Sequence, residues 1–476
     1  MRQRPFQILT AAIFFAVILP ALVQDGMFMD GMLYTSVAHN LANGIGTFWE
    51  PFFSTSWEMS GVNTFHEHPP LVFGIQSIFF KIFGSSIYVE RGYVLLTAIA
   101  TAYMIHRIWK LIYVENLQLQ KMSWLPILFW ITIPVCFWSY QNNMQENTMG
   151  LFCSIAIYFG IQFCRADAMN WSQLLICGNF IFLSAFSKGV PGLFPLACVG
   201  IYWMTHFNFS IIKMIVSTLL LVLIPVIIIA IIYYSNESAA SSLSFYFNSR
   251  LMGRVEAAPT VDSRFYIVGR LISELLGIII ITSLLGLFQQ LKKPIIEHTI
   301  QWKDAFCFLL IGISAAIPLA LTMVQKGFYM VPAFPYLAIG FSILIAPLIV
   351  DFISKINTKK VAFKSLNFIS IVLLISVFIF TSTQFGKRKR DNDLLSDVYE
   401  IGKIIPTHST IGTSQNIWNN WSLHTYLVRH YFISLEKQTS NHTFLLLKKA
   451  NRPKEFSNYK KLKASLNQFD LFQKIE

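Results

Sequence analysis

Charged residues are scarce in this sequence: they make up 13% of its 476 residues, whereas hydrophobic residues make up 54%. A soluble globular chain carries about 25% charged residues, so this composition argues against a soluble protein. Several stretches are almost free of charge over about 20 residues, the length of helix that crosses a bilayer core. Because lipid offers no partner to a backbone polar group, we expect a bundle of membrane-spanning helices.

Cysteine is also rare, and its placement excludes two kinds of site. None of the six cysteines shows metal-ligand spacing, and all lie within or beside apolar stretches: Cys136, Cys153, Cys164, Cys177, Cys198 and Cys307. This placement indicates small residues of a membrane core rather than a disulfide framework or a zinc site.

Nucleotide-binding loops, internal repeats and low-complexity tracts are missing from the sequence, and the last ninety or so residues carry no nucleophile motif. The net charge of +13 does not indicate nucleic acid, because no basic patch belongs to a nucleic-acid-binding module. In a protein with many membrane spans, such an excess reflects cytoplasmic loops and anionic lipid headgroups. We therefore expect membrane lipids as partners and no nucleic acid.

The apolar pattern predicts about eleven transmembrane helices. The first is PFQILTAAIFFAVILPALV after Arg2 and Arg4, and a cleaved signal peptide is the alternative interpretation of this segment. The others are expected at 88–107, 122–140, 147–164, 172–187, 191–206, 211–234, 265–289, 303–323, 331–350 and 366–383. Segment 71–87 is too short to span and is expected to lie along the interface.

Basic residues predict the orientation. Arg2 and Arg4 place the N-terminus in the cytoplasm, and the cytoplasmic segments then hold more lysine and arginine than the outer loops. The run Lys387–Arg390 disagrees, because an odd number of spans puts it on the outer side. Either the charge rule is overridden there or the count is wrong by one.

Two domains are predicted. Residues 1–383 form the transmembrane module, with a long first outer loop at 25–87, and residues 384–476 form a small extracytoplasmic domain. Stretches such as TFLLLKK and WSLHTYLVRH indicate a strand and a helix, and so an α/β fold for this domain.

The stretch Asp25–Leu71 holds the acids of greatest interest. Asp30 lies just beyond the first span, four residues before Tyr34. A carboxylate in that place can take the proton of an attacking hydroxyl group, so Asp30 is a candidate general base. A solvated loop acid or a helix cap is the alternative for Asp30, and it applies more strongly to Asp25.

The motif FHEHPPL places His66, Glu67 and His68 before two prolines that restrict the backbone. These side chains could bind a divalent metal, or a phosphate when the histidines are charged. Adjacent residues of an extended chain point to opposite sides, which weakens the metal interpretation.

Further candidates stand at predicted span mouths: Glu146, Lys188, Arg250, Arg254, Lys326 and Tyr329. An ionisable residue near the membrane is a functional candidate by default. Cations that converge on one outer cavity would suit a phosphate, although each cation alone is explained as an interfacial anchor.

The order of these motifs resembles one enzyme class. An acid four residues before a tyrosine is followed by E-x-P-P-L at Glu67, a short acidic turn at Glu146, K-G-x-x-G at Lys188 and K-x-x-Y-x-x-P-x-x-P at Lys326. This sequence is similar to the GT-C membrane glycosyltransferases, in particular to bacterial relatives of protein O-mannosyltransferases and of the aminoarabinose transferase that modifies lipid A. The similarity extends to about residue 350.

The resemblance implies the GT-C fold in the plasma membrane and an inverting glycosyltransferase. Its donor would be a polyprenyl-phosphate sugar on the outer (periplasmic) face, and its acceptor a lipid, a glycan or a protein. Asp30 and Glu67 would be catalytic, with no required cofactor. Residues expected to bind substrate are Tyr34, His66, His68, Glu146, Lys188, Arg250, Arg254, Lys326 and Tyr329.

One position departs from the family pattern. The lipid A transferases have lysine before the two prolines, where this chain has His68, and this argues against the aminoarabinose reaction in particular. A transporter or flippase of lipid-linked sugars is the main alternative, although such proteins usually show internal repeats and mid-membrane charges. A non-catalytic membrane scaffold is the second alternative.

Overall fold

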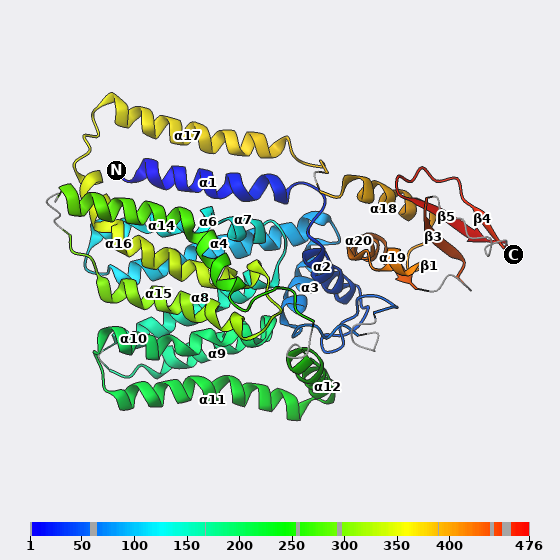
Figure 1. Ribbon diagram of the computed structural model, residues 1–476, viewed down its shortest axis with the longest axis horizontal. Helices are drawn as coiled ribbons and strands as arrows, with labels where there is room; N and C mark the ends of the chain where they lie inside the picture. The colour runs from blue at the N-terminus through cyan, green and yellow to red at the C-terminus, as the bar shows by residue number, and fades with distance from the viewer. Residues whose placement is uncertain are drawn as a thin grey trace.

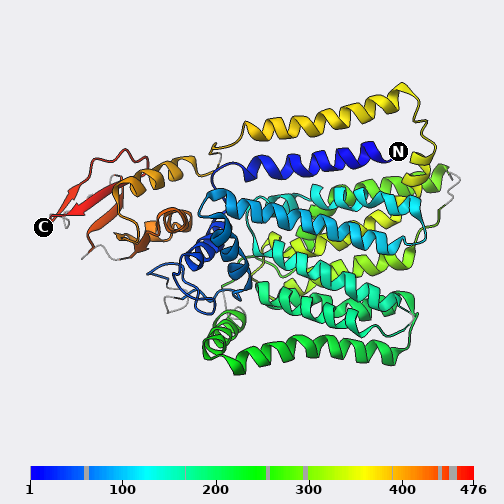
Figure 2. The ribbon, with the colours of Figure 1, turned by 180° about the vertical axis from the view of Figure 1, so that it is seen from behind.

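The computed structural model describes residues 2–57, 64–166, 168–253, 258–292, 298–388, 390–437, 442–449 and 458–475. A bundle of long helices runs side by side, and a smaller domain with a sheet stands at one end of it (Figures 1 and 2). We call this end the loop face, because it also carries α2 (Met29–Ala42) and α3 (Leu71–Phe83). The N-terminus lies at the other end, the opposite face (Figure 1).

Among the described residues, seven helical segments are long and apolar enough to cross a membrane. They are α1 (Arg4–Leu22), α8 (Gln145–Arg165), α11 (Ile211–Ser235), α14 (Tyr266–Lys292), α15 (Trp302–Ala316) with η5 (Ile317–Leu321), η6 (Gly327–Ala333) with α16 (Phe334–Ser354), and α17 (Val361–Ser382). The chain is thus a multi-pass membrane protein, as predicted.

The other four predicted spans fall on helices of the same bundle that are shorter, interrupted or more polar. They are α4 (Ile87–Ile112), the series α5 (Leu117–Gln120), η2 (Lys121–Ser123), α6 (Trp124–Thr132) and α7 (Pro134–Ser139), then α9 (Trp171–Lys188), and η3 (Val190–Ala197) with α10 (Cys198–His206). They pack against the seven, and their crossing of the membrane stays a prediction.

One interruption has a clear cause. Ile133 is extended, with φ −67° and ψ 123°, because the following Pro134 disfavours the helical conformation of the residue before it. α7 then begins at Pro134. The backbone N–H of Val135 donates to Oε2 of Glu274 at 2.9 Å, so a buried acid of α14 caps this new helix start.

The bundle has a centre and a rim. In the most apolar stretch of α8, 72% of the residues are buried, against 6% in α17. The main apolar cluster gathers around α4, α6, α8, α15 and α16. α8 is therefore a core helix, whereas α17 lies at the rim, packed against α1 with most of its side chains exposed.

α17 returns the chain to the loop face, where α18 (Asn392–Ile404) begins (Figure 1). The backbone N–H of Asp25 donates to the carbonyl of Lys387 at 2.8 Å. Lys387, just after the last span, therefore lies at the same face as the first loop, as an odd number of crossings requires.

The C-terminal domain is a mixed α/β unit, as predicted. Its described strands form one sheet in the order β2-β1-β3-β5-β4, in which β1 is parallel to β2 and β3 while β5 is antiparallel to β3 and β4. The strands are β1 (Thr410–Thr413), β2 (Ser434–Glu436), β3 (Phe444–Lys448), β4 (Tyr459–Lys461) and β5 (Phe469–Lys474), and the helices after α18 are α19 (Gln415–Trp418) and α20 (Trp421–Tyr431). The stretches TFLLLKK and WSLHTYLVRH form β3 and α20, as expected.

α2 is the helix around which the loop face is built. It packs between α3 and α20, and all of its residues from 31 to 40 are buried. Gly31 permits a close approach: a Cβ atom there would lie 2.5 Å from the carbonyl oxygen of Asn142. The polar character of α2 thus reflects contacts on every side, not exposure to water.

Candidate active site

Asp30 lies in the first turn of α2 at the loop face. The turn is fixed in place because the N–H of Phe28 donates to Oδ1 of Asn142 at 2.9 Å. Within the described residues, the carboxylate of Asp30 has no hydrogen bond or ion pair. Burial raises the pKa of Asp30, the nearby Glu146 raises it further, and Lys188 and Lys326 act in the opposite sense. A half-buried carboxylate with unfilled acceptors suits a general base.

Glu146 and Lys188 form a buried ion pair beside Asp30. Glu146 is the second residue of α8 and Lys188 is the last residue of α9, and Nζ lies 2.5 Å from Oε1. The two side chains are 0% and 4% exposed. The other oxygen, Oε2, is buried and has no hydrogen-bond partner among the described residues. An acceptor that is buried without a partner is costly, and a substrate hydroxyl group would relieve that cost.

Aromatic rings surround the ammonium group of Lys188. Its Nζ lies 5.8 Å from the ring centres of Tyr34 and Phe328 and 5.2 Å from that of Tyr329. Cation–π attraction holds the charge in this position. Two of these rings, those of Phe328 and Tyr329, belong to η6. The motif K-x-x-Y therefore lies next to Lys188 of the motif K-G-x-x-G.

Lys326 stands at the start of η6, with an exposed side chain. Its neighbour Gln325 anchors the segment: Oε1 accepts from the N–H of Ile267 at 2.9 Å, and Nε2 donates to the carbonyls of Arg264 and Thr322. Lys326 itself has no ion-pair partner in the part of the chain that the structure describes.

The three residues of His66-Glu67-His68 take three separate partners. Nδ1 of His66 lies 3.1 Å from Oγ of Ser242, Glu67 forms an ion pair with Arg250, and Nε2 of His68 lies 3.1 Å from the hydroxyl of Tyr34. The side chains therefore diverge, as expected for an extended backbone.

This divergence leaves no convergent metal ligands. No group of three or more histidine, cysteine, aspartate or glutamate side chains in the described ranges is arranged to hold a metal ion. A metal at His66, Glu67 and His68 stays an untested expectation. Burial lowers the pKa of His66, against an opposing effect of Glu50. This shift favours the uncharged form of His66 and makes it less suited to bind phosphate by charge.

Arg250 comes from a short π-helix, η4 (Tyr246–Met252), that follows α12 (Glu237–Phe245). Such helices are rare and are frequent at functional sites. α12 contacts the first loop, because the ring of Phe245 lies 5.2 Å from that of His66. Arg254, the alternative arginine, lies outside the described residues.

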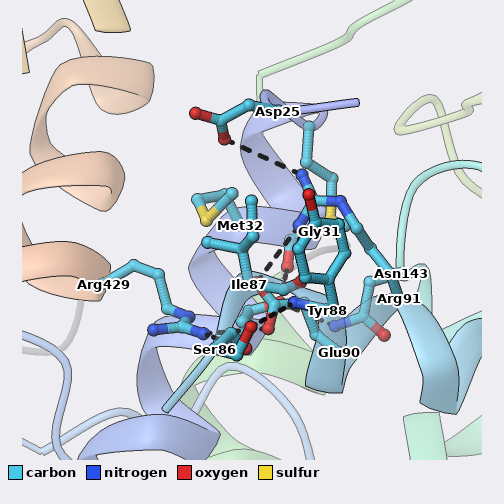
Figure 3. Close-up of polar contacts among 12 residues, drawn as sticks. Asp25, Gly31, Met32, Ser86, Ile87, Tyr88, Glu90, Arg91, Asn143 and Arg429 are labelled. Atoms are coloured by element: carbon cyan, nitrogen blue, oxygen red, sulfur yellow. Dashed lines mark hydrogen bonds and ion pairs between the residues drawn. The ribbon is translucent and has the colours of Figure 1, made fainter. Parts of the chain in front are cut away.

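Asp25 belongs to a different cluster, at the joint between the bundle and the C-terminal domain (Figure 3). Its Oδ2 accepts from the hydroxyl of Tyr399 at 2.6 Å, and its Oδ1 lies 4.0 Å from Arg91. Arg91 also contacts Glu90, whose other oxygen accepts from Arg429 of α20 at 2.9 Å. All of these charged groups are buried.

Several residues of the loop face were not predicted from the sequence. Of these residues, Glu90 could have been found most easily from the sequence, because an acid at the start of an apolar span is a functional candidate. Phe28, Trp138 and Phe328 form an aromatic cluster next to the site, and Arg390 lies 5.4 Å above the Phe28 ring. Aromatic residues are common throughout this chain, so nothing in the sequence singles these out.

Comparisons with known proteins agree with this architecture. Residues 67–234 match the family described as dolichyl-phosphate-mannose-protein mannosyltransferase. No curated protein sequence matches the chain. The crystal structure of ArnT from Cupriavidus metallidurans bound to undecaprenyl phosphate is similar, with a TM-score of 0.67 and 12% identity over 98% of this chain and 97% of that one. The apo structure of ArnT gives 0.63 and 11% over 97% and 95%.

These findings define the class of protein. The chain is a polytopic membrane protein with the GT-C fold, the fold of membrane glycosyltransferases, as its ordered motifs predict. The family match over residues 67–234 covers the stretch from Glu67 through Glu146 and Lys188.

Proposed function

We propose that the chain is an inverting glycosyltransferase that moves a sugar from a polyprenyl-phosphate carrier to an acceptor hydroxyl group, with Asp30 as general base. One observation carries the proposal: the Asp30 carboxylate has no partner among the described residues and lies within electrostatic reach of Lys188 and Lys326. An acid kept free beside cations suits a reaction that takes up a proton and releases an anion.

The proposed step is a single displacement. The acceptor oxygen attacks the anomeric carbon of the sugar while the bond from that carbon to the phosphate oxygen breaks. The hydroxyl proton passes to Asp30, and the electron pair of the broken bond leaves on the polyprenyl phosphate. Attack from the side opposite the leaving group inverts the anomeric centre. The raised pKa of Asp30 makes its ionised form a stronger base than an exposed aspartate.

The leaving phosphate would be stabilised by cations. Lys326 is exposed at the mouth of the site, whereas Lys188 and Arg250 are held by Glu146 and Glu67. We infer that Lys326 meets the phosphate first, and that Tyr329, Lys188 and Arg250 complete its surroundings. The ArnT structure of the same fold contains undecaprenyl phosphate, which supports a carrier of this type.

We propose the plasma membrane as the location, with the loop face on the outer (periplasmic) side. Arg2 and Arg4 at the opposite face support this orientation through the positive-inside rule. The acceptor would then be a lipid, a glycan or a protein of the cell envelope. We propose that Tyr34 and His68, which contact each other at 3.1 Å, and His66 bind this acceptor.

The test is sugar transfer in proteoliposomes. A panel of labelled polyprenyl-phosphate sugars is supplied with an extract of envelope acceptors, and wild type is compared with Asp30→Asn. Asp393→Asn, an exposed acid of α18, is the matched control. We expect label to reach an acceptor with wild type and the control but not with folded Asp30→Asn.

Two outcomes would overturn the proposal. Transfer that persists in Asp30→Asn would remove Asp30 as the base. Movement of the intact donor across the bilayer without any transfer would identify a transporter of lipid-linked sugars.

A further inference from the structure

A cationic pocket lies at the opposite face, at the far end of α1 from Asp30. Its volume is about 620 Å³, and its charged lining residues are Arg2, Arg4 and Lys121. No acidic residue lines it in the described part of the chain. The same three cations have no ion-pair partner among the described residues. Three positive charges around one pocket favour an anionic ligand.

An apolar groove begins where this pocket ends. Gln7 lines both, and the groove continues between α1, α4 and α6 along Phe14, Phe15 and Ile99, with a volume of about 390 Å³. Ile99 is 42% exposed, so the groove opens to the lipid side of the bundle. Its mainly apolar lining suits a hydrocarbon chain.

The groove also contains one polar group without a partner. Thr10 is 4% exposed, and its Oγ1 makes no hydrogen bond within the described residues. A threonine in a helix ordinarily donates to a carbonyl of the preceding turn, as Thr35 does in α2. Thr10 stands one turn beyond Gln7, where the polar pocket passes into the apolar groove. A ligand with an ester or hydroxyl group below its charged head would satisfy this hydroxyl.

We propose that this pocket and groove bind one anionic phospholipid, with its phosphate among Arg2, Arg4 and Lys121, its ester region at Thr10 and an acyl chain along Phe14, Phe15 and Ile99. This site is separate from the proposed donor site. The 19 residues of α1 span about 28 Å at 1.5 Å per residue, so the two sites face opposite leaflets.

The occupant is a phospholipid rather than a free anion because the pocket and the groove adjoin at Gln7. A free phosphate would use the cations alone and leave the groove and Thr10 without a role. If anionic lipids were held only by general attraction to a basic surface, loss of Arg2, Arg4 and Lys121 would weaken binding no more than loss of three other lysines at the same face.

The test measures lipid retention by native mass spectrometry. Full-length protein is delipidated in detergent and titrated with phosphatidylglycerol or phosphatidylcholine. The variant Arg2→Gln/Arg4→Gln/Lys121→Gln is compared with Lys110→Gln/Lys303→Gln/Lys364→Gln, which removes three exposed lysine charges outside the pocket. We expect the first variant to lose phosphatidylglycerol affinity by on the order of tenfold and the second to change it by less than about twofold.

A second measurement tests the groove directly. Phosphatidylglycerol with a photoreactive group in one acyl chain should crosslink to the stretches that contain Phe15 and Ile99, and Thr10→Val should reduce its affinity by a few-fold. The crosslinking experiment uses the wild-type protein, so its result does not depend on whether a variant folds.

Four outcomes would overturn the proposal. Equal losses in both triple variants would show generic surface attraction. Equal retention of phosphatidylcholine by the wild type would remove the role of the anionic head. Crosslinks elsewhere would remove the groove, and tight retention of a co-purified polyprenyl phosphate in its place would replace the phospholipid as occupant.

Discussion

Asp25 and Asp30 stand five residues apart at the loop face, yet their surroundings are opposite. Asp25 has its acceptors filled: Oδ1 receives the N–H of Gly26 at 2.8 Å and Oδ2 the hydroxyl of Tyr399 at 2.6 Å. Asp30 has no hydrogen bond in the described chain, and burial raises its pKa. A carboxylate with satisfied acceptors holds structure together, and one with unfilled acceptors is available to a substrate.

The two regions also share a device, a buried acid paired with a buried cation. At the joint, Glu90 pairs with Arg429 at 2.9 Å, and near Asp30, Glu146 pairs with Lys188 at 2.5 Å. The pair at the joint connects the bundle to the C-terminal domain. The pair at the site connects α8 to α9 and leaves Oε2 of Glu146 without a partner among the described residues. The same chemistry therefore serves docking in one place and a candidate binding surface in the other.

The largest expected difference between the two regions is in catalysis. Asp30→Asn should reduce the transfer rate by about 10²–10⁴-fold, the usual range for loss of a general base, without a change in folding. Asp25→Asn should leave the rate within a few-fold and lower the stability of the joint. Initial rates in proteoliposomes measure the first effect, and thermal unfolding in detergent measures the second. A similar rate loss in both variants would contradict the assignment of Asp30 to catalysis and Asp25 to structure.

Removal of the cation from either buried pair should cost stability, but by different amounts. Lys188→Met leaves the Glu146 carboxylate buried without its cation, and we expect a loss of about 3–5 kcal/mol. Arg429→Met should cost less, because Glu90 keeps its second partner, Arg91, at 3.3 Å. The double variants, in which both partners of a pair are replaced, should behave differently in the two regions. Glu90→Gln/Arg429→Met should recover both stability and transfer, whereas Glu146→Gln/Lys188→Met should recover stability alone. Recovery of transfer in the second double variant would assign that pair to structure only.

The hydrogen bond between Tyr399 and Asp25 should have a smaller effect. A hydrogen bond to a charged group contributes about 1.5–3 kcal/mol, so Tyr399→Phe should loosen the C-terminal domain by that order while transfer changes little. Hydrogen exchange of α18 and α20 measures the loosening. Tyr88→Phe is the control, because Tyr88 is 40% exposed. Unchanged exchange in Tyr399→Phe would show that Asp25 contributes little to docking.

The smallest expected effect is a shift in the pH profile. Transfer requires ionised Asp30, so the rate should fall as the pH falls through the raised pKa of this group. Lys326 lowers that pKa, so Lys326→Gln should raise it further and move the acid limb of the kcat profile to higher pH, by less than about one unit. Lys364→Gln at the opposite face should leave the limb in place. A shift to lower pH would contradict the proposed neighbourhood of Asp30 and Lys326.

The ordered motifs predicted much of the candidate site, because each lies at the mouth of a helix on one face. Glu146 and Lys188 end up paired although 42 residues separate them, since α8 and α9 are adjacent in the chain and pack side by side. Lys326 and Tyr329 belong to a segment that is far from α8 and α9 in the sequence. Only their motif predicted that they lie near Glu146 and Lys188. The aromatic rings of Phe28 and Trp138 had no comparable signal.

The joint could not have been predicted from local patterns. Arg429 pairs with Glu90 across 339 positions of the chain, and nothing near either residue marks the partner. The core of the C-terminal domain likewise includes Met27 and Met32 from the first loop. The basic run Lys387–Arg390 signalled a topological conflict in the sequence, and in the structure its first residue contacts Asp25 through the backbone.

The sequence by itself determined that this is a helical membrane protein with a small α/β domain, because hydrocarbon requires long uncharged helices and alternating patterns require strands. Its motifs also predicted that Asp30 shares one side of the membrane with Glu67, Glu146 and Lys188. Tertiary structure alone decided which acids are satisfied and which are left free. That distinction depends on contacts such as those of Tyr399 with Asp25, Arg250 with Glu67 and Lys188 with Glu146. Such contacts form between distant segments, whose approach is set by the packing of the whole bundle and not by the residues on either side.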